Sequence, residues 1–254
     1  MRIAVLGSGN GGCAVAFDCA AHRHSVSLFD FDTFPDNIKR IRQQGGIRAE
    51  GELEGFAPVA YAGHEIDKAL TDAEIIYVVG PAYSTGPFAE ACRPYLRRDQ
   101  IVIVCPGSCM GSIEFKNGAK LGLRDQDIVV AETSTLPYAV RIVGPGRIRV
   151  FLKVGDGLFI AAVPSRNVPR VIEKIRDLYP ARSDAIDAAA KSSLRPLAIA
   201  STSWLGCTGT TVPGGTSCHA EKNIVQLSPT SIGGITSAAE KLAESYSACP
   251  DCKR

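Results

Sequence analysis

The chain opens on an apolar run that passes directly into a glycine-rich turn. Ile3, Val5 and Leu6 are typical of a buried strand, and Gly7-Ser8-Gly9-Asn10-Gly11-Gly12 follows at once. Residues 13–21 are mostly small and apolar and contain no proline, so they can form a helix that packs closely on a sheet. A turn of this kind directs backbone N–H groups and a helix N-terminus at one point, which suits a pyrophosphate.

A bare G-x-G-x-x-G spacing is a weak signal because glycine is common, but the next strand strengthens it. Residues 25–29 predict a strand that ends at Asp30, about twenty residues after the glycines, where an acid accepts hydrogen bonds from a ribose 2′-OH. Gly7 would serve the tight turn, Gly9 would let the backbone approach the phosphates, and Gly12 would let helix and strand touch. The alternatives are a glycine turn without a ligand and a solvated acid at Asp30.

The predicted ligand is therefore a dinucleotide, and Asp30 favours NAD because its carboxylate would repel a 2′-phosphate. NADP stays open because Lys39, Arg40 and Arg42 follow in the sequence.

Composition limits the other classes of function. The 254 residues are 45% hydrophobic and 21% charged, as in an ordinary globular protein, and a net charge of +2 gives no reason to expect nucleic acid or a membrane as partner. No signal peptide or membrane span is evident, so we expect a cytoplasmic protein whose nine cysteines stay reduced. The lone Cys249-x-x-Cys252 lacks a second pair, and we predict no metal site.

Strands that alternate with helices predict an α/β fold of the Rossmann type, with a doubly wound parallel sheet. After the first two strands we expect a helix over 34–44 and short strands or loop over 47–61. The remaining strands of the parallel sheet are expected at 74–79, 100–105 and 127–131. Segments 140–143, 147–154 and 158–163 are separated by turn residues, and they predict an antiparallel meander that extends the sheet.

The sequence pattern changes near residue 192. The segment beyond it is rich in Ser and Thr, poor in acids and weakly periodic, which is typical of irregular structure. We therefore predict two parts, an NAD(P)-binding Rossmann domain over residues 1–191 and a short irregular C-terminal segment over residues 192–254.

In a doubly wound sheet, ligands bind outside the carboxyl ends of the strands. Three further loops follow predicted strands, at Gly80–Ser84, Pro106–Gly111 and Glu132–Pro137. The first two could flank the cofactor or be ordinary turns. Glu132 could bind a cationic group of a substrate, or it could be a solvated or helix-capping acid. The candidate cofactor contacts in these loops are Pro81, Tyr83, Ser84, Pro106 and Gly107.

Reduction of a C–N or C–O bond usually requires a proton donor near the reacting atom. His22, His24 and His64 precede predicted strands and are expected at the opposite edge of the sheet, whereas His219 lies in the irregular tail. The catalytic residue therefore stays unknown.

Four segments resemble the opine dehydrogenase family, and together they extend over about residues 1–194. They are Val5–Gly12, Pro81–Ser84 with Phe88-Ala89, Ile101–Gly107, and Glu132-Thr-Ser-Thr-Leu-Pro-Tyr-Ala139 with Arg141. The resemblance implies reductive condensation of an amino acid with an α-keto acid, with NAD(P)H reducing the imine. It implies that Gly9, Asn10, Gly11, Gly12 and Asp30 bind the cofactor, and that Glu132, Thr133 and Ser134 face the substrate.

The chain departs from that family after residue 194. The family carries its catalytic histidine in an Asn-Pro-x-x-His-Pro motif of a helical domain, whereas here no histidine follows until Ser217-Cys218-His219-Ala220. We hypothesise a truncated or frame-shifted ending. The alternatives are a dinucleotide-binding module without activity, and a glycerol-3-phosphate or 2-hydroxyacid type of dehydrogenase, against which the Glu132–Tyr138 motif argues. The sequence does not indicate the oligomeric state.

Overall fold

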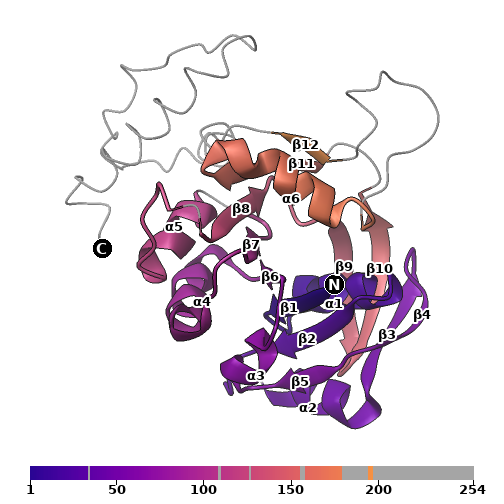
Figure 1. The fold of residues 1–254 in the computed structure, drawn as a ribbon. Coiled ribbons are helices and arrows are strands. Elements are labelled where there is room, and N and C mark those ends of the chain that lie inside the picture. Colours follow the sequence, from indigo (N-terminus) through magenta and orange to yellow (C-terminus); the bar gives the residue numbers. More distant parts are fainter. Residues whose placement is uncertain (34, 108–109, 126, 155–157, 179–193, 197–254) are drawn as a thin grey trace, which may run out of the picture.

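The computed structural model describes residues 1–33, 35–107, 110–125, 127–154, 158–178 and 194–196 (Figure 1). The predicted C-terminal segment 192–254 therefore lies outside the described residues, apart from Leu194–Pro196. The same holds for His219 and for the Cys249/Cys252 pair.

A mostly parallel sheet of eight strands forms the centre of the described structure, which confirms the predicted fold class (Figure 1). Six strands are parallel, β11 is antiparallel to β8, and β12 joins β11 just beyond the predicted boundary at residue 191. In spatial order the strands are β5 (Tyr61–Gly63), β2 (Ser25–Phe29), β1 (Arg2–Leu6), β6 (Ile75–Val78), β7 (Ile101–Val104), β8 (Val129–Thr133), β11 (Leu158–Val163) and β12 (Leu194–Pro196).

Both faces of this sheet are buried. Alternate residues of each strand point to opposite faces, and they belong to two different core clusters. Ile3 and Val5 belong to one core cluster, and Ala4 and Leu6 belong to the other. The first cluster includes residues of α1 (Asn10–Ala21), α2 (Pro35–Gln44) and α6 (Val168–Ile175). The second includes residues of α3 (Ile66–Leu70), α4 (Thr85–Cys92) and α5 (Gly111–Gly118). Short 3-10 turns lie at Ala82–Ser84, Arg93–Tyr95 and Ser165–Asn167.

A second sheet of four strands corrects the prediction of one continuous meander. Its order is β4 (Gly55–Pro58), β3 (Gly46–Gly51), β10 (Arg147–Lys153) and β9 (Tyr138–Gly144). The β9–β10 hairpin therefore pairs with β3, and of the three segments only β11 extends the main sheet. Ile148 and Val150 of β10 are buried in the cluster that contains α1, so the hairpin covers α1 (Figure 1). Local turn signals identify the hairpin but not its partner.

Candidate dinucleotide site

The glycine turn between β1 and α1 has no room for side chains at two positions. Gly7 has a φ of 108°, and a Cβ there would lie 2.0 Å from the carbonyl oxygen of Val79. A Cβ on Gly12 would lie 1.8 Å from the carbonyl oxygen of Gly7. Gly9 differs, because no atom lies within 4 Å of the place its Cβ would occupy. The turn therefore packs tightly against neighbouring backbone at Gly7 and Gly12, and it leaves open space at Gly9.

The N-terminus of α1 offers unused donors at this open point. No side chain caps the helix at Gly9, and the hydrogen bond from the Cys13 N–H to the Gly9 carbonyl measures 3.0 Å. The N–H groups of residues 10–12 have no partner within the helix, as is general for a first turn. Free N–H groups together with the positive end of the helix dipole favour an anion, and a pyrophosphate fits this geometry.

The Asp30 carboxylate is held against the turn. Its Oδ2 atom accepts hydrogen bonds from the Ser8 N–H at 2.6 Å and the Ser8 hydroxyl at 2.7 Å. Its Oδ1 atom accepts one from the Phe31 N–H at 2.9 Å. A carboxylate has about four acceptor positions, so Oδ1 retains capacity for a further donor such as a ribose hydroxyl. Asp30 is 7% exposed, so its side chain is largely buried and only a small part of the residue reaches solvent.

Asn37 of α2 hydrogen-bonds to the glycine turn. The sequence analysis did not identify this residue. Its amide nitrogen donates to the Ser8 carbonyl and approaches the Cys13 Sγ atom at 3.0 Å, while its Oδ1 atom accepts from the Gly146 N–H at 2.7 Å. Burial raises the pKa of the Cys13 thiol to about 12, so the group beneath the turn stays uncharged. No sequence spacing signals such a contact.

The Asn10 side chain is also engaged by the protein. Its Oδ1 atom accepts a hydrogen bond of 2.7 Å from the Ile142 N–H of β9. This hydrogen bond holds β9 beside the start of α1.

His64 corrects the expectation that it lies at the opposite edge of the sheet. It directly follows β5, a parallel strand that the sequence did not resolve, and its Nδ1 atom lies 2.8 Å from the Asp30 carbonyl oxygen. His64 is therefore at the carboxyl edge, beside Asp30. His22 and His24 precede β2 and lie at the other edge, as expected.

The loops after β6 and β7 reach the same edge of the sheet. In the first, the Ser84 hydroxyl donates to the Pro81 carbonyl at 2.7 Å, and Tyr83 is 83% exposed. In the second, Pro106 is partly buried, and the Gly107 N–H donates to the Thr133 carbonyl at 2.8 Å. A Cβ on Gly107 would lie 2.7 Å from the Cβ atom of Glu132, so this loop packs directly on the end of β8.

The three predicted substrate residues at the carboxyl end of β8 differ in their access to solvent. Glu132 is fully buried, and its Oε2 atom accepts a hydrogen bond of 2.9 Å from the Ser112 N–H near the start of α5. Thr133 is 2% exposed and donates its hydroxyl to the Thr135 carbonyl at 3.0 Å. Ser134 alone is exposed, and its N–H donates to the Phe159 carbonyl at 3.0 Å.

Leu136 brings this segment to the glycine turn. Its methyl carbons lie 2.9 and 3.0 Å from the position that a Cβ on Gly11 would occupy, and a Val79 methyl lies 3.0 Å from the same point. The turn after β1, the end of β6 and the segment after β8 therefore meet in space, although more than a hundred residues separate the first from the last.

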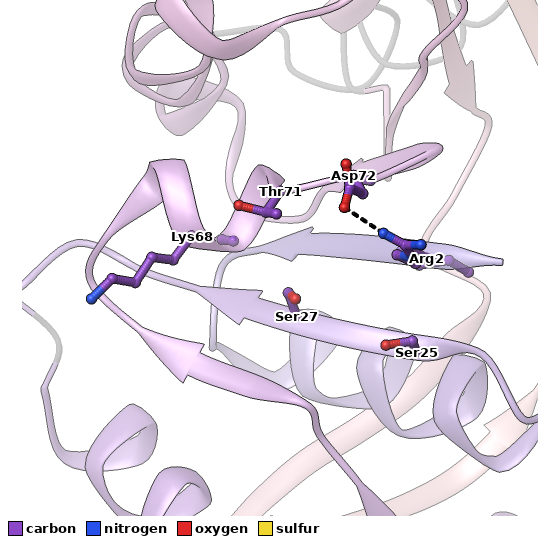
Figure 2. Close-up of a pocket in the computed structure, with 9 residues that line it drawn as sticks. Arg2, Ser25, Ser27, Lys68, Thr71 and Asp72 are labelled. Atoms are coloured by element: carbon purple, nitrogen blue, oxygen red, sulfur yellow. Dashed lines mark hydrogen bonds and ion pairs between the residues drawn. The ribbon is translucent and has the colours of Figure 1, made fainter.

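A cavity of about 250 Å³ lies elsewhere, at the amino ends of β1 and β2 (Figure 2). Arg2 and Ser25, the first residues of the two strands, line it together with Ser27, Lys68, Thr71 and Asp72. Its charged groups are paired. Arg2 bonds Asp72 (Figure 2), and Lys68 bonds Glu65 beside the cavity. The cavity is therefore separate from the dinucleotide turn, which is at the carboxyl edge.

The described residues contain neither a cluster of metal-binding side chains nor a membrane-spanning helix. Among them, no three His, Cys, Asp or Glu side chains lie close enough to hold a metal ion. Within the same ranges, no helix is both long and apolar enough to cross a membrane.

Comparison with known proteins gives the family. Residues 2–112 match the model described as the N-terminus of NAD-dependent glycerol-3-phosphate dehydrogenase. The chain is 32% identical over 183 residues to an opine dehydrogenase of Arthrobacter sp. (strain 1C), which corresponds to 70% of this chain and 48% of that protein. This domain is an NAD-binding domain of the opine dehydrogenase family.

One further curated relative and one solved structure are also similar to this opine dehydrogenase domain. An opine dehydrogenase of Haliotis discus hannai is 25% identical over 181 residues, or 66% of this chain and 44% of that protein. A solved structure of octopine dehydrogenase in complex with NADH and agmatine has the same fold, with a TM-score of 0.64 and 15% identity over 84% of this chain and 56% of that one. The chain thus spans about half the length of the curated opine dehydrogenases that it matches.

Proposed function

We propose that this chain binds NAD(H) across the turn between β1 and α1 and serves an opine dehydrogenase type of reaction. The single observation that carries the proposal is the meeting of open Gly9, the free N–H groups of residues 10–12 and the Asp30 carboxylate at one edge of the sheet. The pyrophosphate would lie over Gly9 and the start of α1, and the adenosine ribose would donate to Asp30.

The cofactor preference follows from the same carboxylate. A 2′-phosphate beside Asp30 would be repelled, so NADH is expected to bind more tightly than NADPH. Titration of both cofactors, followed by their fluorescence, tests this in the wild-type chain and in Asp30→Ala. Loss of the ribose hydrogen bond should weaken NADH binding by about tenfold to a hundredfold, since a hydrogen bond to a charged group contributes roughly 1.5–3 kcal/mol. Unchanged NADH affinity in the variant would remove Asp30 from the site.

The proposed reaction joins an amino acid to an α-keto acid and reduces the resulting imine. Solved octopine dehydrogenases have been studied with NADH and agmatine, pyruvate or L-arginine, and we propose the same substrate classes here. Bound NADH would supply the hydride. Ser134 is the exposed member of the predicted substrate trio, so we propose that it contacts substrate while buried Glu132 and Thr133 hold it in place.

An assay of NADH oxidation with pyruvate and a panel of amino acids that includes arginine and agmatine tests this activity. Turnover with one pair supports the opine dehydrogenase proposal. Tight NADH binding without turnover for any pair would support the second candidate, a dinucleotide-binding module without activity. The glycerol-3-phosphate family model favours neither, because residues 2–112 end before the Glu132–Tyr138 motif.

We further propose that the cofactor domain comprises residues 1–191 and that residues 192–254 form a separate segment, whose one described strand, β12, pairs with the edge of the domain at β11. Limited proteolysis with mass spectrometry should then release a stable fragment that ends near residue 191, and NADH should protect it further. Cleavage first within residues 1–178 would contradict this division. We also propose a cytoplasmic location, because a reducing compartment would keep the cysteines of the chain as free thiols. Cell fractionation tests this location.

A further inference from the structure

A buried carboxylate inside α1 connects the cofactor helix with the segment after β8. Asp18 is fully buried, and its Oδ2 atom accepts a hydrogen bond of 2.6 Å from the Tyr138 hydroxyl. The Lys153 ammonium of β10 lies 2.7 Å from the same oxygen and neutralises its charge. Neither the dinucleotide turn nor the predicted substrate residues include this group, yet burying a carboxylate is unfavourable unless it is paired and hydrogen-bonded.

Tyr138 ends the segment that begins at Glu132, and the two ends are fixed in the same way. At one end the Glu132 carboxylate accepts the Ser112 N–H, and at the other the Asp18 carboxylate accepts the Tyr138 hydroxyl. Residues 134–136 form the part between these two buried anchors. Two fixed ends limit where this part can lie.

The contacts of Leu136 show what the anchored segment touches. It packs against Gly11 of the turn and Val79 at the end of β6. Gly11 and Asp18 are seven residues apart in α1, about two helical turns, so they share one face of the helix. The segment is therefore fixed along the same face of α1 on which its central residue meets the glycine turn.

The position of this contact selects one half of a bound dinucleotide. β1 lies between β2, which ends at Asp30, and β6, which ends near Val79. A dinucleotide that crosses the sheet at β1 with its adenosine ribose at Asp30 places its nicotinamide half toward β6. Leu136 lies on that second side.

We propose that Asp18 is a positioning residue for the nicotinamide half of the cofactor, which it affects by holding Tyr138 and hence residues 134–136 against the turn. This role rests on the proposed NAD(H) site and deepens it. Asp18 itself does not contact the cofactor. The backbone of this end stays paired with β10 through Tyr138 and Lys153, so loss of the bond to Asp18 should loosen the segment without releasing it. Contacts on the nicotinamide side should weaken, while the adenosine side keeps Asp30.

The test compares NADH with ADP, which contains the adenosine and pyrophosphate parts alone. Calorimetric titration of the full chain should give Tyr138→Phe a Kd for NADH about fivefold higher, the effect of one net hydrogen bond, and a Kd for ADP within about twofold of wild type. Tyr61→Phe is the matched control, because its hydroxyl bonds Glu65 at 3.0 Å on the surface near the start of α3, and neither Kd should change.

Leu136→Ala provides a second variant at a half-buried side chain, and it should show the same split between NADH and ADP even if Tyr138→Phe folds poorly. Equal weakening of both ligands would indicate general loosening of α1 and would overturn the positioning role. Unchanged NADH affinity in both variants would overturn it as well. A wild-type chain that binds no NADH would instead refute the proposed function, and the positioning role with it.

Discussion

Asp30 and Glu132 are two carboxylates in equivalent sequence positions, each at the carboxyl end of a parallel strand, and the structure uses them differently. Asp30 bonds the glycine turn through Ser8, is slightly exposed, and keeps an acceptor position on Oδ1. Glu132 turns inward, is fully buried, and accepts the Ser112 N–H. The place of an acid along a strand therefore predicts which edge of the sheet it occupies, but not whether its side chain faces a ligand or the next helix.

The glycine turn beside Asp30 and the end of β8 at Glu132 are the two regions compared. The largest expected effect on stability is at the glycines of the turn. In Gly12→Ala the new Cβ would lie 1.8 Å from a backbone oxygen that cannot move independently, so we expect a loss of about 3 kcal/mol or more in stability. Gly9→Ala is the matched control, since its φ of −71° suits alanine and no atom lies within 4 Å. Thermal unfolding should detect destabilisation in the first variant only.

NADH titration of the same pair sharpens the comparison. Gly9→Ala should stay folded and still lose NADH affinity, because its Cβ would occupy the space through which the backbone approaches the phosphates. A Gly9→Ala chain that binds NADH as tightly as wild type would show that the pyrophosphate does not lie over Gly9.

The second prediction concerns Glu132. Replacement by Gln keeps an oxygen for the Ser112 N–H but removes the charge, so we expect stability to fall by roughly 1–2 kcal/mol. NADH affinity should stay unchanged, in contrast with Asp30→Ala. Urea unfolding and NADH titration check the two halves of this statement. Normal stability combined with loss of substrate binding would instead return Glu132 to the role that the sequence suggested, that of a direct substrate ligand.

Much of the cofactor region could be predicted from sequence because its determinants are local. Gly7, Gly12 and Asp30 act through backbone sterics and through the end of one strand, and these follow from spacing. Asn37 and Asp18 were missed because they act through contacts with Ser8, Gly146 and Tyr138, which only tertiary packing brings together. β5 was missed because three residues give too short a pattern, and His64 was misplaced with it.

The third prediction compares thiols in the two regions. Cys13 lies beneath the turn and Cys105 lies at the end of β7, and burial raises the pKa of each to about 12 from an ordinary value of 9.0. Above pH 9 the unfolded chain releases these protons while the folded chain keeps them, so stability falls as pH rises toward 12. Each thiol should account for about 1 kcal/mol of loss between pH 9 and pH 10.

Urea unfolding at these two pH values, in wild type and in Cys13→Ala and Cys105→Ala, measures that share. Each variant should lose about 1 kcal/mol less than wild type over the interval. A variant with the full wild-type pH dependence would show that its thiol is already ionised or exposed in the folded chain. Such a result at Cys13 alone would indicate that the turn opens more readily than the end of β7.

The smallest structural effect is expected at Tyr83, in the loop between β6 and α4. Its side chain is 83% exposed and contributes little packing, so Tyr83→Ala should change stability by less than about 0.5 kcal/mol. If Tyr83 contacts bound cofactor, as its place after β6 suggests, NADH affinity should fall while ADP affinity stays constant, because the loop lies on the nicotinamide side of β1. Removal of an exposed aromatic side chain next to a ligand site changes the stability of the free protein little, and it lowers the affinity for the ligand more. If the variant binds NADH and ADP as tightly as wild type does, Tyr83 does not contact the cofactor. Residues 134–136 would then be the main protein contact on the nicotinamide side.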